Sequence, residues 1–193
     1  RGFSIRFDAD LDMRMNQKSD LTAKKVLNTY DVKKLTALFR EYGEVDNAFK
    51  LANLIVEART NGSIYTTAQL KEIIKPCTPK FEESRYLAKV YQAIRIEVNQ
   101  EMEALKECLT QCVHLLKPDA RLVVMSYHSL EDRLVKNVIR SGNVEGVEEK
   151  DLVFGKITRY FKSLTSKPIV PDAEEIEKNS RARSAKLRIA VKL

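Results

Sequence analysis

Residues 126–132, Ser-Tyr-His-Ser-Leu-Glu-Asp, form the best candidate site in the chain. They end a nearly continuous apolar run, 121–127, that is typical of a buried strand in a parallel sheet. In open α/β sheets the ligand crevice lies outside the carboxyl ends of the strands. His128 could accept or donate a proton there, or hydrogen-bond a base edge, and Ser126 could orient it.

The same segment also has a structural interpretation. Ser129 and Asp132 have the spacing of a capping box, and we expect them to open the helix that follows. No local structural rule requires histidine at position 128, so we favour a functional role for His128. A serine hydrolase would need glycines beside its nucleophile, and neither Ser126 nor Ser129 has one, which disfavours that class.

Residues 1–15 alternate charged and apolar side chains irregularly, with three aspartates at every second position: Asp8, Asp10 and Asp12. A calcium loop would need glycine where Met13 stands and glutamate where Ser19 stands, so we expect no calcium site. We expect instead an ordered loop that lines a crevice, with Phe3 and Arg14 available to a nucleotide.

Positive charge is concentrated near the end of the chain. Residues 156–193 hold ten Lys and Arg against four acids, which is over half of the net charge of +7. This favours a polyanionic partner, nucleic acid before membrane, although a solubilising surface has the same composition. Four of these cations lie within eight residues and could bind phosphates or protect an edge strand: Arg181, Arg183, Lys186 and Arg188.

Cysteine and glycine usage narrows the function classes further. Three cysteines without a CxxC pair indicate a reducing compartment, the cytoplasm, and argue against disulfides and zinc. Cys108 and Cys112 could hold a metal from one helix face, but small buried side chains are the favoured interpretation. The six glycines never cluster, so these residues contain no dinucleotide or phosphate loop. No apolar run approaches the ~20 residues of a membrane helix.

Periodicity predicts an α/β protein in which short helices precede a helix–strand–helix segment and two terminal strands. Four short helices are expected after caps at Asp20, Asp31, Asp46 and Thr66 or Thr67. One long helix is expected over 84–117, and strands over 121–127, 155–164 and 185–193. These strands cannot close a doubly wound sheet, so a preceding block of βα units is expected to be missing.

Four motifs lie at 1–15, 91–99, 126–136 and 180–188. In this order and spacing they closely resemble the MraW family of bacterial small-subunit ribosomal RNA cytosine-N4 methyltransferases. The departures are mild: Ala9-Asp10 replaces Gly-Pro, Tyr127 replaces Phe and Ser180 replaces Pro.

The resemblance implies a Rossmann-like methyltransferase domain that uses S-adenosylmethionine. Residues 1–15 would be a crevice-lining loop, 16–85 an all-α inserted domain for RNA recognition, and 86–193 the C-terminal half of the methyltransferase sheet. The family's glycine-rich cofactor loop lies upstream of Arg1, so no cofactor-binding residue is expected in this chain, and these 193 residues alone are expected to be inactive.

The resemblance also suggests roles for individual residues. His128 and Ser126 would be catalytic, and the base would be bound by Tyr127, Arg133, Asp12 and Arg14. The four cations of the last motif would bind RNA backbone or fix the terminal strand. The expected partner is small-subunit ribosomal RNA or the ribosomal subunit, and exposed sheet edges favour a homodimer. A non-catalytic RNA-binding or assembly module remains the alternative, while near-neutral early helices disfavour a helix-turn-helix DNA binder.

Overall fold

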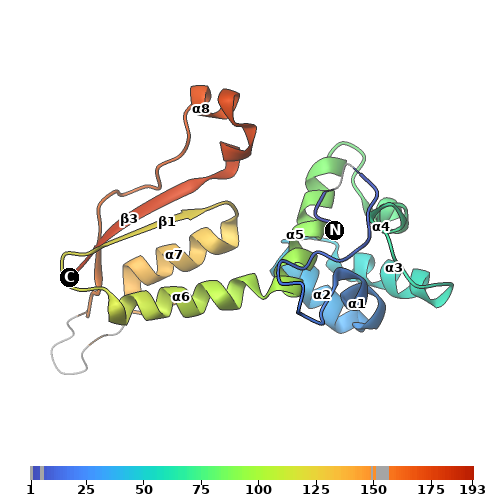
Figure 1. The fold of residues 1–193 in the computed structure, drawn as a ribbon, viewed down its shortest axis with the longest axis horizontal. Coiled ribbons are helices and arrows are strands. Elements are labelled where there is room, and N and C mark those ends of the chain that lie inside the picture. Colours follow the sequence, from blue (N-terminus) through green and yellow to red (C-terminus); the bar gives the residue numbers. More distant parts are fainter. Residues whose placement is uncertain (1, 5–6, 149, 151–156) are drawn as a thin grey trace. The chain divides into compact units, whose positions relative to one another are not determined.

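The structure is a computed structural model that describes residues 2–4, 7–148, 150 and 157–193. The chain divides into two compact units, residues 1–101 (unit 1) and 102–193 (unit 2), which are described separately (Figure 1). None of the described helices is long and apolar enough to cross a membrane.

Unit 1 is helical. Its elements are α1 (Ala23–Thr29), α2 (Val32–Glu41), α3 (Ala48–Thr60), α4 (Thr67–Ile74), the 3₁₀ turn η1 (Lys75–Cys77) and α5 (Glu83–Asn99). Asp31 caps α2 and Thr66 caps α4 through a capping box with Gln69, as the sequence predicts. The other two predicted caps are wrong. Thr22 caps α1, and α3 begins after Asn47 without any side-chain cap.

All five helices of unit 1 contribute to one hydrophobic core. Its fully buried members include Leu27, Leu35, Phe39, Leu51, Ile55, Leu70 and Ile94. Because α5 supplies part of this core, the compact unit does not end near residue 85. An inserted domain over 16–85 is defined by the strands that come before and after it in the whole protein, so it stays a prediction.

Gly43, just after α2, allows α2 and α5 to approach closely. A Cβ atom at Gly43 would lie 2.8 Å from the Phe39 carbonyl and 2.9 Å from the Lys89 carbonyl on α5. The left-handed residue at this helix end is Glu44, with φ 49°, rather than the glycine itself. Glycine therefore serves packing here, not backbone conformation.

The predicted single helix over 84–117 is wrong, because the helix is interrupted at Gln100. This residue has left-handed dihedrals (φ 51°, ψ 40°) and ends α5, and α6 (Glu101–Leu115) begins directly after it. Apolar spacing continues across the break, so periodicity alone could not reveal it.

Unit 2 contains a small sheet covered by helices. After α6 come β1 (Arg121–Ser126), α7 (Ser129–Ser141), β2 (Phe161–Ser163), α8 (Ala173–Lys178), the 3₁₀ turn η2 (Ser180–Ser184) and β3 (Lys186–Lys192). The strand order is β1-β3-β2, and both pairings are antiparallel. Strands are confirmed in all three predicted regions, although residues 155 and 156 of one prediction lie outside the described residues.

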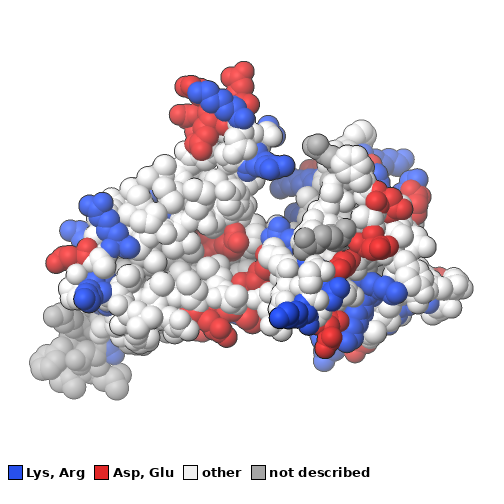
Figure 2. All heavy atoms as spheres, in the orientation of Figure 1, with Lys and Arg blue, Asp and Glu red and all other residues white. Residues whose placement is uncertain are grey.

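The prediction that β1 is a buried strand of a parallel sheet is wrong among the described residues. Side chains on one face of the sheet pack on α6 and α7, with Leu122, Val138 and Ala190 in that core. On the other face Val123 and Met125 are 54% and 53% exposed. Figure 2 shows a broad area without charged side chains on this part of unit 2.

Candidate functional site

The carboxyl end of β1 leads directly into the first turn of α7, and Ser126, Tyr127 and His128 lie at this junction. Ser126 is 3% exposed, and its Oγ donates to the Lys186 carbonyl at 3.3 Å. Tyr127 is half exposed, with its side chain at the surface. Ser126 is thus positioned to hold β1 against β3, and Tyr127 is the more accessible of the two.

His128, not Ser129, is the N-cap of α7. Its Nδ1 accepts from the Glu131 amide at 3.4 Å, and the Glu131 carboxylate accepts from the amides of Tyr127 and His128 at 2.8 and 3.3 Å. The predicted capping box is therefore wrong by one residue. Since Nδ1 is an acceptor, the neutral ring carries its proton on Nε2, which lies 3.4 Å from the Glu131 carboxylate. His128 thus has a local structural role that the sequence did not indicate.

The sequence predicts Ser129 as the partner of Asp132, but the Asp132 side chain binds residues of β3 instead. Its carboxylate accepts from Arg188 Nε at 2.6 Å and Nη2 at 3.1 Å, and Lys186 Nζ lies 3.5 Å away. The Arg188 hydrogen bond lowers the pKa of Asp132 below its ordinary value. Of the two roles predicted for Arg188, RNA binding or fixing the terminal strand, this geometry matches the second.

The remaining basic candidates of unit 2 lie at its surface. Arg181 and Arg183 are exposed on η2, and Arg133 is exposed on the first turn of α7. Their side chains are accessible to a polyanion.

The loop of residues 7–15 is ordered against the helices of unit 1. Asp8 accepts from the Ala68 amide at 2.9 Å, and this bond lowers the pKa of Asp8. Asp12 and Arg14 form a two-point ion pair, at 2.7 and 3.0 Å, and Arg14 also donates to the Ser19 carbonyl. Asp12 and Arg14 are therefore engaged with each other and with the loop backbone.

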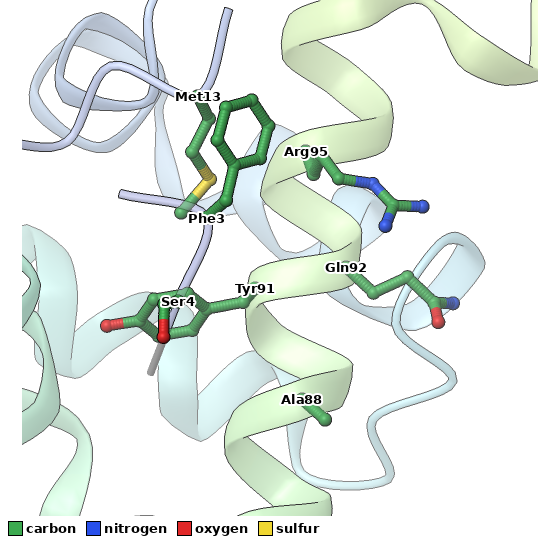
Figure 3. A pocket seen from close by; sticks show the side chains of 7 residues that line it. All are labelled: Phe3, Ser4, Met13, Ala88, Tyr91, Gln92 and Arg95. Atoms are coloured by element: carbon green, nitrogen blue, oxygen red, sulfur yellow. The ribbon is translucent and has the colours of Figure 1, made fainter. Parts of the chain in front are cut away.

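A pocket of about 430 Å³ lies between this N-terminal segment and α5 (Figure 3). Its described lining residues are Phe3, Ser4, Met13, Ala88, Tyr91, Gln92 and Arg95. In Figure 3 the Phe3 ring and the Met13 side chain lie together, and Tyr91 points toward Ser4. Phe3 was a predicted nucleotide contact and lines this pocket, whereas Arg14 does not.

Tyr91, Gln92 and Arg95 were missed as site residues, although they stand in a motif that the sequence singled out. Burial raises the pKa of Tyr91 to about 12, so its hydroxyl stays protonated and donates to the Thr67 carbonyl at 3.1 Å. Arg95 donates to both oxygens of Glu101 at 2.9 Å. Positions 91 and 92 lie four and three residues before position 95, so these three polar side chains lie on one side of a helix. That spacing is the signal in the sequence that indicates a shared site.

This pocket does not fit S-adenosylmethionine. The cofactor has ribose hydroxyls and a positive sulfonium, and carboxylates are the side chains that complement both. None of the described lining residues is acidic, and the one cation, Arg95, is already paired with Glu101. We therefore assign no residue described here to the cofactor.

The described residues also contain no group of three His, Cys, Asp or Glu side chains that could hold a metal ion. Cys77 is buried and Cys112 half-buried, but Cys108 is exposed, contrary to the expectation of small buried side chains.

The four motifs are joined in pairs. In unit 1 the Asn99 side chain donates to the Met13 carbonyl at 2.8 Å and accepts from the Met15 amide at 2.7 Å, which joins 1–15 to 91–99. In unit 2 the Asp132–Arg188 pair joins 126–136 to 180–188. Residues that are remote in sequence are thus held together by side-chain bonds within each unit.

Comparison with known proteins agrees with these motifs. The chain is 56% identical over 192 residues to "Ribosomal RNA small subunit methyltransferase H" of Bacteroides thetaiotaomicron, and 55% identical over 193 residues to the protein of the same name from Flavobacterium johnsoniae. Each alignment covers 100% of this chain and 63% of the relative, so the chain spans less than two thirds of their length. The profile of the MraW methylase family matches residues 1–193, and the chain belongs to that family.

Proposed function

We propose that the protein represented by this chain is a cytoplasmic methyltransferase that uses S-adenosylmethionine to modify the exocyclic N4 of a cytosine in small-subunit ribosomal RNA. The observation that carries this proposal is the pairwise joining of the four family motifs by Asn99 and by Asp132–Arg188. The relatives, which are named ribosomal RNA methyltransferases, support it over the full length of this chain.

The chemistry requires close positioning. The lone pair of the cytosine amine is delocalised into the ring, so the amine is a weak nucleophile that needs a hydrogen-bond acceptor beside it. Positioning of this kind can lower a barrier by about 7–11 kcal/mol. The cofactor would supply the methyl group.

We place His128 at the edge of the base, where its Nε2–H would donate to a ring acceptor of the cytosine, with Tyr127 and Arg133 beside the base. Ser126 would act from beneath as a positioning residue, because it is buried and bonded to Lys186. Asp12 and Arg14 would likewise shape the loop that faces the substrate, since their ion pair uses the charges of both.

For the whole protein we propose a Rossmann-like sheet in which β1, β3 and β2 form one edge and residues 16–85 are the helical insertion. The outward edge of β1, which has no partner among the described strands, would then pair with a further strand. The relatives' greater length leaves room for such strands.

Methyl transfer tests the proposal directly. The full-length protein and the 193-residue chain would each be incubated with tritiated S-adenosylmethionine and undermodified small ribosomal subunits. We expect label at a cytosine N4 with the full-length protein and none with the 193-residue chain. Label on another atom would overturn the N4 assignment, and turnover by the short chain would overturn the proposed need for the rest of the protein.

A non-catalytic RNA-binding or assembly module is the second candidate, favoured by the exposed Arg181 and Arg183 on η2. Salt-dependent RNA binding would occur in both cases and does not separate them. Calorimetry of the full-length protein with S-adenosylmethionine does, because only the enzyme is expected to bind the cofactor.

A further inference from the structure

A basic groove lies between α7 and β2, and of its described lining residues only Arg188 is also a candidate site residue. This α7–β2 groove, of about 590 Å³, is lined by five cationic residues and by no acidic residue among those described. Its cations are Lys136, Arg140, Arg159, Lys162 and Arg188.

Four of the five charges are available to a ligand. Arg188 is neutralised by Asp132. Arg140 donates to the Gly146 carbonyl, which is neutral, and no carboxylate of the described residues forms an ion pair with it. Lys136, Arg159 and Lys162 are exposed, and within the described part of the chain none of them has a carboxylate within ion-pair distance.

The groove is built by packed elements rather than by surface side chains alone. Ile139 on α7 and Phe161 on β2 form its floor and are 8% and 3% exposed. Lys136 and Arg140 are one helical turn apart, so they project from the same side of α7. The cations are thus held around a fixed concave surface.

The composition of the groove selects phosphate groups. Four cations without a carboxylate partner among the described residues, together with the hydroxyl of Ser166, match the oxyanions of a phosphodiester chain. Phe161 is too deeply buried to stack on a base, so the groove offers no reader of base identity. Its concave shape admits a polynucleotide strand more readily than a flat bilayer.

The β2 end of the groove lies away from His128, whereas Arg188 in the groove reaches Asp132 in the first turn of α7. Lys162 pairs in register with Val191, and Val191 pairs with Arg121 at the start of β1, whereas His128 follows the end of β1. The two ends of this strand are roughly 17 Å apart. A strand in the groove would therefore be held several nucleotides from a base at His128.

We propose that the α7–β2 groove binds the phosphodiester backbone of the RNA substrate without sequence preference, as a second contact remote from the methylated base. This inference rests on the proposed function, because it takes the RNA substrate from there.

The test uses the full-length protein with Lys136→Gln and Lys162→Gln combined. Its control combines Lys106→Gln and Lys117→Gln, two exposed lysines of unit 2 that do not line the groove, which removes the same charge elsewhere. Circular dichroism melts verify that both variants fold. Fluorescence anisotropy then measures RNA affinity at several salt concentrations, with a ribosomal RNA fragment and with a scrambled RNA.

We expect the slope of log affinity against log salt to fall by about 2 in the groove variant, since each lost phosphate contact lowers it by about 1. The loss should be equal for both RNAs, and the control should keep the wild-type slope. An unchanged slope, or an equal fall in the control, would overturn the proposal. Loss of binding to phosphatidylserine vesicles with the RNA slope unchanged would overturn it in favour of a membrane contact.

The groove and the proposed function can fail separately. If the wild type transfers methyl groups but the groove variant keeps its salt slope, the groove inference falls and the function stands. If the variant loses slope but the wild type transfers no methyl group, the groove inference stands and the function falls. If both hold, the variant should raise the KM for RNA and leave kcat unchanged.

Discussion

Asp132 and Arg188 are 56 residues apart and form a two-point ion pair that ties the first turn of α7 to β3. Their side chains are only 13% and 17% exposed. Two of the family motifs are therefore the two sides of one contact, and loss of the Asp132 charge would leave the Arg188 guanidinium enclosed without this partner.

Removal of the Asp132 charge should destabilise unit 2. In Asp132→Asn the Arg188 guanidinium stays charged and largely enclosed, so we expect the free energy of unfolding to fall by about 3 kcal/mol. Urea unfolding measures this loss. The control is Lys106→Gln, which breaks a half-exposed pair with Glu103 and should cost less than about 1 kcal/mol. Equal losses in the two variants would contradict an enclosed pair.

The same pair predicts a dependence of stability on acid pH. Arg188 lowers the pKa of Asp132 below the ordinary value of 3.8, so the folded state favours the carboxylate. The stabilisation is complete above that ordinary value and is lost as pH falls through the lowered pKa. Between about pH 6 and about pH 3, the wild type should lose more unfolding free energy than Asp132→Asn. Parallel curves for the two proteins would exclude this linkage.

How far the sequence predicts the structure depends on whether the signal is local. Asp31 and Thr66 act on amides within three residues, and both caps are confirmed. Gln100 breaks a helix whose apolar spacing continues beyond it, and nothing in its residue type favours left-handed backbone.

The candidate site shows the same limit. The strand end at 126–128 was found, but the partners of Asp132 and Asn99 lie far along the chain and leave no spacing signal. The residues of β1 are nearly all apolar, so the sequence does not show that only one face of this strand is buried.

Asn99 should fix the N-terminal loop. Asn99→Ala removes the acceptor of the Met15 amide and the donor to the Met13 carbonyl, so we expect a loss of about 1–2 kcal/mol in unfolding free energy. Hydrogen exchange at the Met15 amide should accelerate at the same time. Asn53→Ala is the control, because among the described residues its side chain bonds within its own helix, to the Phe49 carbonyl. Unchanged exchange at Met15 would show that the loop is held elsewhere.

The exposed sheet face predicts self-association of the 193-residue chain. Val123 and Met125 present apolar surface beside the open edge of β1, and such surface favours contact between copies. Gel filtration should show a dimer that Met125→Lys shifts toward monomer. Phe49→Lys, at a 62% exposed position in unit 1, should leave the profile unchanged. A monomeric wild type would contradict the prediction.

His128 has a capping role and a proposed catalytic role, and one substitution can separate them. In His128→Asn the side chain still offers an N-cap acceptor, and asparagine is a preferred N-cap residue, so stability should be kept or rise slightly. The Nε2–H donor is lost, and methyl transfer by the full-length protein should fall by about 10²–10³-fold, the usual contribution of one positioned hydrogen-bond donor. His128→Ala is the comparison and should lose stability as well as activity. Near-wild-type turnover in His128→Asn would reduce His128 to a helix cap, because capping would then be the only property of the imidazole that the enzyme needs.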